Sequence, residues 1–128
     1  MRKLIYYILD YIFLHSLEPK VMRILKNEKK LVIFDIGCFR GIFTKGILKL
    51  VGEKKFKFFL FDINKNTREY ISNLLLSRNI SYHEVALSNK NGTAKYNYNS
   101  FFESSGSSFY SLRPRYLVNG ICHLGTFF

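Results

Sequence analysis

Two aspartates and two glycines have the types and the spacing of a nucleoside-binding site. Asp35 ends the apolar run LVIFD and is followed by Gly37 and Gly41. Asp62 ends a second apolar run, KFFLFD, 25 residues after Gly37. Glycines after a strand let the backbone turn sharply against a ligand and let the next helix start close to it. An acidic side chain at the end of the next strand suits the two hydroxyls of an adenosine ribose, so we expect a nucleoside cofactor here.

The residues between these glycines favour a cofactor without phosphates. The fingerprint of nicotinamide dinucleotides is GxGxxG, and Phe39 stands where its second glycine would be. A pyrophosphate must approach the backbone closely, and the side chains of Phe39 and Arg40 hinder that approach. S-adenosylmethionine (SAM) has the ribose and no phosphate. We therefore expect SAM as the cofactor.

Other candidates for chemistry are weaker. Cys38 and Cys122 lie far apart without a CxxC pair, which predicts neither a zinc site nor a disulfide framework, but two reduced thiols in a cytoplasmic protein. His83 is followed by Glu84, yet a histidine at a strand end is more often structural than an acid–base catalyst. The sequence assigns no catalytic base.

The elements that must position the site follow from the hydrophobic pattern. The continuous apolar runs 31–35 and 57–62 predict strands buried on both faces of a parallel sheet. Between them, apolar residues at helical spacing predict a helix that Gly52 ends. Asn66 and Glu69 have the spacing of a capping box. They predict a helix that ends near Asn79 and faces inward with Tyr70, Ile71, Leu74 and Leu75.

The rest of the chain predicts further strands. Residues 80–87 predict a third strand, which completes a strand–helix–strand–helix–strand pattern typical of a doubly wound α/β sheet. Ligands of such sheets bind beyond the carboxyl ends of the strands. The segment NKNG at 89–92 predicts a hairpin turn, and alternation over 94–99 predicts a half-exposed return strand. The stretch from Ser111 onward has no clear period and receives no assignment.

Residues 1–30 predict a helical segment ahead of a sheet domain in residues 31–128. Apolar residues recur at helical spacing, and Pro19 predicts the start of a second, short helix. Asp10 interrupts the apolar stretch, which excludes a signal peptide, and no run of about 18 apolar residues could span a membrane. We expect the first helix to cap the edge of the sheet; contact with a membrane surface is the alternative. The apolar residues of that helix are Leu4, Ile5, Ile8, Leu9, Ile12 and Phe13.

Composition limits the partners. The chain has 128 residues, which is the size of one domain, and a net charge of +11. A basic chain with 22 Phe and Tyr residues can bind nucleic acid, so a basic RNA-binding or RNA-methylating module is the alternative reading. The lysines, however, are spread from Lys3 to Lys95 rather than clustered, and neither an RNP-type motif nor NPPY occurs. We expect a solvated basic surface and no nucleic-acid partner.

Three motifs in order resemble the FkbM family of SAM-dependent methyltransferases. They are VIFDIGCFRGIFTKGILK, then FLFDIN, then HEVALSNKNGTAKYNY with SSGSS, and the resemblance spans residues 31–112. In the first motif Cys38 has the position of the usual alanine, and Asp62 stands where the family has a glutamate followed by proline. In the third motif, Ala86, Leu87, Ser88 and Gly92 match the family pattern A-L-S-x-x-x-G.

The resemblance implies a class I methyltransferase fold that methylates a hydroxyl of a sugar, glycan or small natural product. It implies that the glycines face the methionine end of SAM and that Asp62 faces the ribose. Ala86 and its neighbours would lie near the adenine. The cofactor-binding residues implied are Asp35, Gly37, Cys38, Gly41, Asp62 and Ala86. Nothing in residues 113–128 matches the fourth strand of the family, so we expect an incomplete Rossmann-like sheet that carries the cofactor half of the site.

Overall fold

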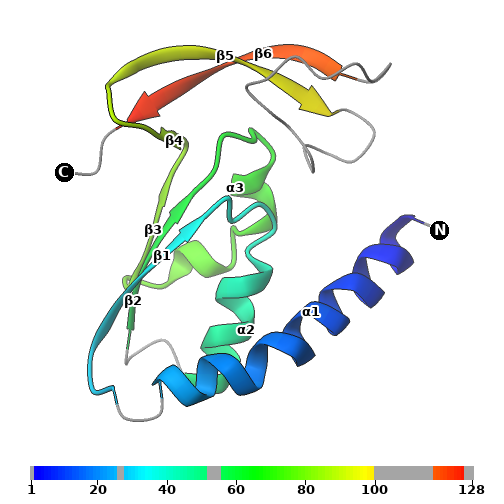
Figure 1. The fold of residues 1–128 in the computed structure, drawn as a ribbon, viewed down its shortest axis with the longest axis vertical. Coiled ribbons are helices and arrows are strands. Elements are labelled where there is room, and N and C mark those ends of the chain that lie inside the picture. The colour runs from blue at the N-terminus through cyan, green and yellow to red at the C-terminus, as the bar shows by residue number, and fades with distance from the viewer. Residues whose placement is uncertain (1, 26–27, 52–55, 100–116, 126–128) are drawn as a thin grey trace.

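The computed structural model describes residues 2–25, 28–51, 56–99 and 117–125 and contains both helices and strands (Figure 1). The helices are α1 (Arg2–Leu25), α2 (Ile42–Val51), α3 (Thr67–Tyr70) and the short 3₁₀ helix η2 (Leu74–Leu76). The strands are β1 (Leu31–Ile36), β2 (Phe56–Phe61), β3 (Ile80–His83), β4 (Ala86–Leu87), β5 (Gly92–Asn99) and β6 (Leu117–Gly125).

The first sheet is parallel, with the strand order β1-β2-β3. Its register pairs Phe34 with Phe59 and Phe59 with Ser81. The α/β class and the strands expected at the two apolar runs are therefore confirmed. Because the three strands are parallel, their carboxyl ends share one edge, where the predicted site residues at the ends of β1 and β2 come together.

One face of this sheet carries the core. Helices α1 and α2 lie on the same side of it (Figure 1), and every second strand residue points toward them. The buried cluster on this side joins sheet and helix residues: Leu25, Cys38, Ile47, Phe56, Phe58, Leu60, Ile71 and Ile80. Leu25 of α1 therefore belongs to the same core as the strands.

The other face of the first sheet is exposed at β1, so the expectation of burial on both faces was wrong there. Val32, Phe34 and Ile36 are 49%, 44% and 66% exposed. Stacked rings continue this face across the sheet: Phe34 lies 5.3 Å from Phe59 between ring centroids, and Phe61 lies 5.1 Å from His83. The apolar run has no polar alternation to reveal that the described helices lie on one side only.

Helix α1 is one continuous helix, so the second helix expected at Pro19 was wrong. Proline removes one backbone donor, which leaves the carbonyl of His15 without its helical partner. Both residues lie on the exposed side, where water can replace the lost bond. The turns after Pro19 are held because Val21 and Leu25 pack against the core.

Helix α1 packs along α2 instead of capping the edge of the sheet. A Cβ atom added to Gly46 of α2 would overlap Leu14 of α1, so the two backbones lie close together at this crossing. The apolar positions expected to face the core are partly exposed. Ile8 and Ile12 are 51% and 58% exposed.

The helix expected from the capping box was also wrong. Asn66 makes no side-chain cap bond; its N–H donates instead to Oδ1 of Asn64 at 3.0 Å. One turn of α-helix is followed by the 3₁₀ turn η2, because Ser and Asn are poor helix formers and Ser72 precedes Asn73. Ile71 is buried as expected, whereas Tyr70 is 36% exposed.

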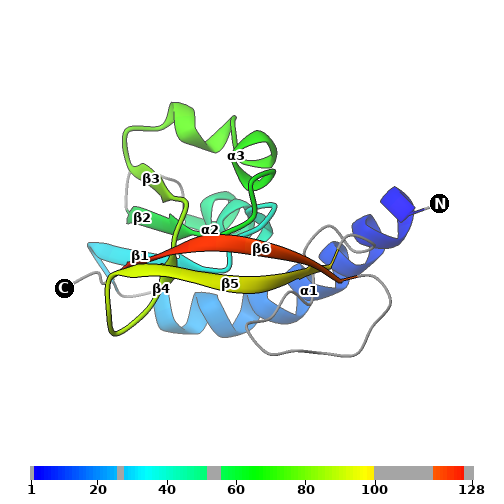
Figure 2. The same cartoon turned by 90° about the horizontal axis from the view of Figure 1, so that it is seen from above.

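A second sheet has the order β4-β6-β5 and lies beyond the carboxyl ends of the first (Figures 1 and 2). Residues 80–87, expected as one strand, divide between β3 and β4 in different sheets. The expected hairpin does not form either, because β6 lies between β4 and β5. Leu124 pairs with Ala86 on one side and with Gly92 on the other.

Candidate functional site

The turn after β1 has the conformation that its glycines allow. Gly37 and Gly41 have φ values of +80° and +67°, in the left-handed region that favours glycine. Phe39 between them has φ of +40°, which is rare for a residue with a side chain. The turn leads directly into α2, as expected from the spacing of its two glycines.

The backbone N–H groups of this turn bond within the chain. Those of Gly37 and Cys38 donate to the carbonyl of Phe61 at 2.8 and 3.1 Å. The N–H of Gly41 donates to the carbonyl of Cys38 at 2.6 Å. The N–H of Phe39 donates to Oδ2 of Asp62 at 2.7 Å. A phosphate at the turn would have to displace these bonds, because phosphate-binding turns offer free N–H groups.

Asp62 is the residue that joins the loops after β1 and β2. Its Oδ2 accepts the Phe39 N–H, and its Oδ1 accepts the N–H of Asn64 at 2.8 Å. The Tyr82 hydroxyl donates to the Asp62 carbonyl at 3.3 Å. Burial raises the pKa of Tyr82, and the Asp62 charge raises it further. The carboxylate expected at this position is therefore held in a fixed orientation beside the glycine turn.

Asp35 and Cys38 lie in the interior beside the turn. The Thr44 hydroxyl donates to Oδ2 of Asp35 at 2.7 Å. Burial raises the pKa of Asp35 despite this hydrogen bond, and the charge of Asp62 adds to the rise. Burial also raises the pKa of the Cys38 thiol, and the charges of Asp62 and Asp35 raise it further. Cys38 is thus a neutral core residue whose backbone, rather than its sulfur, belongs to the turn.

Two cations connect the turn to the helices, and neither role is visible in the sequence pattern. Arg40 forms an ion pair with Asp10 of α1, with Nη2 2.9 Å from Oδ1. The Lys45 ammonium donates to the carbonyl of Arg40 at 2.9 Å and to that of Tyr70 at 3.2 Å. Burial lowers the pKa of Lys45, and the Arg40 charge lowers it further. The Arg40–Asp10 pair and the Lys45–Tyr70 bond join residues 30 and 25 positions apart, so no local spacing could predict them.

The two glycines differ in what surrounds them. A Cβ atom at Gly41 would lie 2.9 Å from side-chain atoms of both Ile71 and Leu74. A Cβ atom at Gly37 would have nothing within 4 Å. Gly41 thus lets the segment after α3 pack closely, as a structural glycine does. Gly37 leaves the backbone open to anything that approaches from outside.

Ala86 lies apart from the other expected site residues. It begins β4 and pairs with Leu124 in the second sheet, three residues after the carboxyl end of β3. Asp35, Gly37, Cys38, Gly41 and Asp62 are joined instead by the bonds and charges described above. His83 supports this edge as a structural residue: its carbonyl accepts the Asp62 N–H at 3.2 Å. The SSGSS segment falls outside the described residues.

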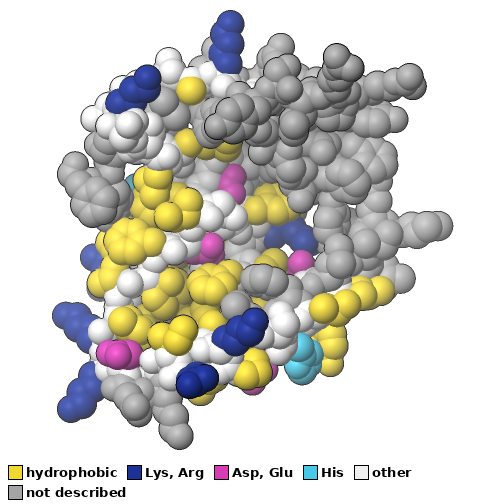
Figure 3. All heavy atoms as spheres, viewed as in Figure 1, with side chains coloured by type: hydrophobic (Ala, Val, Ile, Leu, Met, Phe, Trp, Pro, Cys, Tyr) yellow, Lys and Arg dark blue, Asp and Glu magenta, His cyan; other side chains and the backbone are white. Residues whose placement is uncertain are grey.

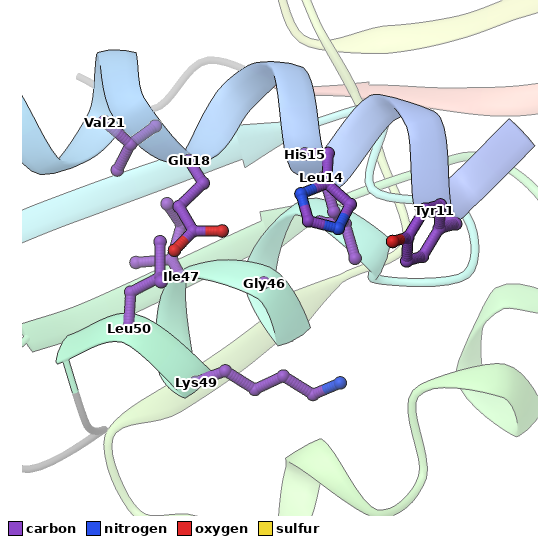
Figure 4. A pocket seen from close by; sticks show the side chains of 9 residues that line it. All are labelled: Tyr11, Leu14, His15, Glu18, Val21, Gly46, Ile47, Lys49 and Leu50. Carbon is purple, nitrogen blue, oxygen red and sulfur yellow. The ribbon is translucent and has the colours of Figure 1, made fainter.

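A small hollow lies elsewhere, between α1 and α2 (Figure 4). Its volume is about 190 Å³, and Tyr11, His15 and Glu18 of α1 face Lys49 of α2 across it. In Figure 3 hydrophobic side chains gather over the lower part of the molecule, with Lys and Arg at its margin. In the part of the chain that the structure describes, no group of three metal-binding side chains lies together.

Comparisons with family models, curated proteins and solved structures found no match to this chain. Among residues 2–25, 28–51, 56–99 and 117–125, no helix has the length and apolar character to cross a membrane.

Proposed function

We propose that the chain binds SAM at the glycine turn and Asp62 and is the cofactor-binding part of a class I methyltransferase similar to the FkbM family. The acceptor is a hydroxyl of a sugar, glycan or small natural product. The observation that carries the proposal is the 2.7 Å bond from the Phe39 N–H to Asp62. It supports a site in which an acidic side chain and an open glycine backbone face the same ligand.

The bonding of the turn favours a cofactor without phosphates. The N–H groups of Gly37, Cys38 and Phe39 are already used within the chain. The carboxyl groups of Asp35 and Asp62 lie close enough for the charge of one to raise the pKa of the other. Negative charge at this edge repels phosphate and attracts a sulfonium or an amine. These features support SAM over a nicotinamide dinucleotide.

Asp62 also has the capacity to bind two ribose hydroxyls. Each oxygen of a carboxylate can accept two hydrogen bonds, and each oxygen of Asp62 accepts one backbone N–H. One acceptor position therefore remains on each oxygen. The two backbone bonds hold the carboxylate in place before the ligand arrives, which lowers the entropy cost of binding.

In the proposed reaction, the residues of this chain bind and orient the cofactor. When bound, SAM supplies a methyl group already activated as a sulfonium, so the protein needs mainly to align the acceptor with it. A hydroxyl acceptor must also lose a proton, and we assign that step to no described residue. The proposal therefore covers cofactor binding in detail and the acceptor only by chemical class.

The test is calorimetric titration of S-adenosylhomocysteine into the wild-type chain and the variant Asp62→Asn. The amide keeps one acceptor oxygen and loses the charge, so we expect affinity to fall by about tenfold or more. Glu69→Gln is the matched control, because it makes the same change at an exposed carboxylate. Equal affinity in wild type and Asp62→Asn would contradict the ribose assignment. Tighter binding of a nicotinamide dinucleotide would contradict SAM.

A further inference from the structure

Helix α1 exposes large apolar side chains to solvent. Ile8, Tyr11 and Ile12 are 51%, 65% and 58% exposed. Their spacing, i, i+3 and i+4, places them on adjoining positions of one helix surface. We call these three residues the α1 stripe. Further along the helix, Val21 and Leu25 pack against the core.

Positive charge flanks the α1 stripe. Lys20 and Arg23 are exposed further along the helix, and Lys49 of α2 lies across the hollow from Tyr11 (Figure 4). Of the two acidic residues in α1, Asp10 is paired with Arg40 of the glycine turn and so carries little uncompensated charge. Glu18 is the other and lies at the hollow. The exposed side of α1 therefore combines apolar side chains with an excess of cations.

We propose that α1 lies flat on an anionic lipid surface and inserts the α1 stripe between the headgroups. Exposed aliphatic and tyrosine side chains on a helix that also carries exposed Lys and Arg are features that an interfacial helix shares. The net charge of +11 attracts the whole chain to a negative membrane surface. This inference does not depend on the proposed cofactor.

Two other occupants fit the surface less well. A second copy of this chain carries the same net charge of +11, which disfavours its approach. A nucleic acid would satisfy the cations, but its phosphate backbone offers no apolar layer to receive Ile8 and Ile12. An anionic bilayer satisfies both features of the surface at once, which is why we choose it.

The test is sedimentation with vesicles made of equal amounts of phosphatidylcholine and phosphatidylglycerol. We expect the wild-type chain to bind these vesicles and to bind pure phosphatidylcholine much less. The double variant Ile8→Ser/Ile12→Ser should lose about tenfold in partitioning, because two aliphatic side chains no longer insert. The matched control is Val32→Ser/Ile36→Ser, which removes two exposed aliphatic side chains from the first sheet and should bind as wild type does.

A fluorescence measurement keeps the test independent of how well the double variants fold. The chain contains no tryptophan, so Tyr11→Trp introduces a single reporter in the α1 stripe. We expect its emission to shift to shorter wavelength when anionic vesicles are added. Absence of wild-type binding, an unshifted emission, or equal loss of binding in the sheet variant would each overturn the proposal. If RNA added to the vesicle mixture displaced the chain and returned the emission to its vesicle-free wavelength, the nucleic acid would be the preferred partner and the proposal would be overturned.

Discussion

Gly37 and Gly41 share a left-handed backbone but differ in what an added side chain would meet, so the same substitution should have two different effects. Gly37→Ala meets open space, and only the backbone conformation opposes it, at a cost of about 1 kcal/mol. Gly41→Ala carries the same cost and also presses on Ile71 and Leu74, so we expect a loss of about 3 kcal/mol. Urea unfolding followed by circular dichroism measures both. Equal losses would show that the segment after α3 does not pack on Gly41.

Asp35 should make stability depend on pH. Burial raises its pKa above the ordinary 3.8, so the native chain keeps a proton that the unfolded chain releases. Its contribution is therefore most favourable below pH 3.8 and declines as the pH rises through the raised pKa. Asp35→Asn has no charge to bury. At neutral pH we therefore expect it to be more stable than wild type.

The measurement is the difference in unfolding free energy between Asp35→Asn and wild type at a series of pH values. The difference should grow from acidic to neutral pH. Glu69→Gln, an exposed carboxylate made neutral, should show no such growth. A difference independent of pH would mean that Asp35 ionises as freely in the native chain as in the unfolded one.

Individual site residues differ in how far the sequence could predict them. Asp62 could be predicted because a strand end is visible in the hydrophobic pattern and the residue is acidic. The bond that fixes it, from Phe39, could not, because it depends on a left-handed φ at a residue with a side chain. The Lys45 contacts to Arg40 and Tyr70 join three segments and have no local signature.

The crossing of α1 and α2 depends on one glycine. Gly46→Leu would push α1 away, because even a Cβ atom at this position overlaps Leu14. We expect a loss of about 2 kcal/mol in the free energy of unfolding, typical of an overpacked contact. Lys20→Leu adds the same side chain at an exposed position of α1 and should change stability by about 0.5 kcal/mol or less.

Chemical denaturation of both variants decides this prediction. A Gly46→Leu variant as stable as wild type would mean that the two helices do not touch at this point. The variant also places a side chain in the hollow between the helices, because Gly46 lines it. A small apolar molecule should therefore not bind there in the variant.

Helix boundaries were the least predictable elements. Local propensity predicted a break at Pro19 and a regular helix after Asn66, and both were wrong. In α1 the core contacts of Val21 and Leu25 outweigh one lost hydrogen bond. After α3, the close approach to Gly41 places Ile71 and Leu74 three residues apart on one side, the spacing of a 3₁₀ turn.

Across the whole molecule, the first sheet could be predicted; of the second, the strand expected over 94–99 is confirmed as β5, but its pairing with β6 could not be predicted. The first depends on apolar runs that stand out in the sequence and on parallel strands that follow each other in chain order. Strand β6 contains two glycines and two polar residues, so its local preference for a strand is weak. It is a strand because it pairs with β4 on one side and with β5 on the other. The incomplete methyltransferase sheet and the cofactor class remain predictions.

The central place of β6 sets an order of events during synthesis of the chain. Strands β1, β2 and β3 all lie within residues 31–83, so the first sheet can form as soon as that length has left the ribosome. Strands β4 and β5 come next, but their described partner is β6, in residues 117–125. The second sheet therefore has to wait for β6. A nascent chain of which residues 1–99 have left the ribosome, but residues 117–125 have not, would have its glycine turn already formed and β5 still without β6.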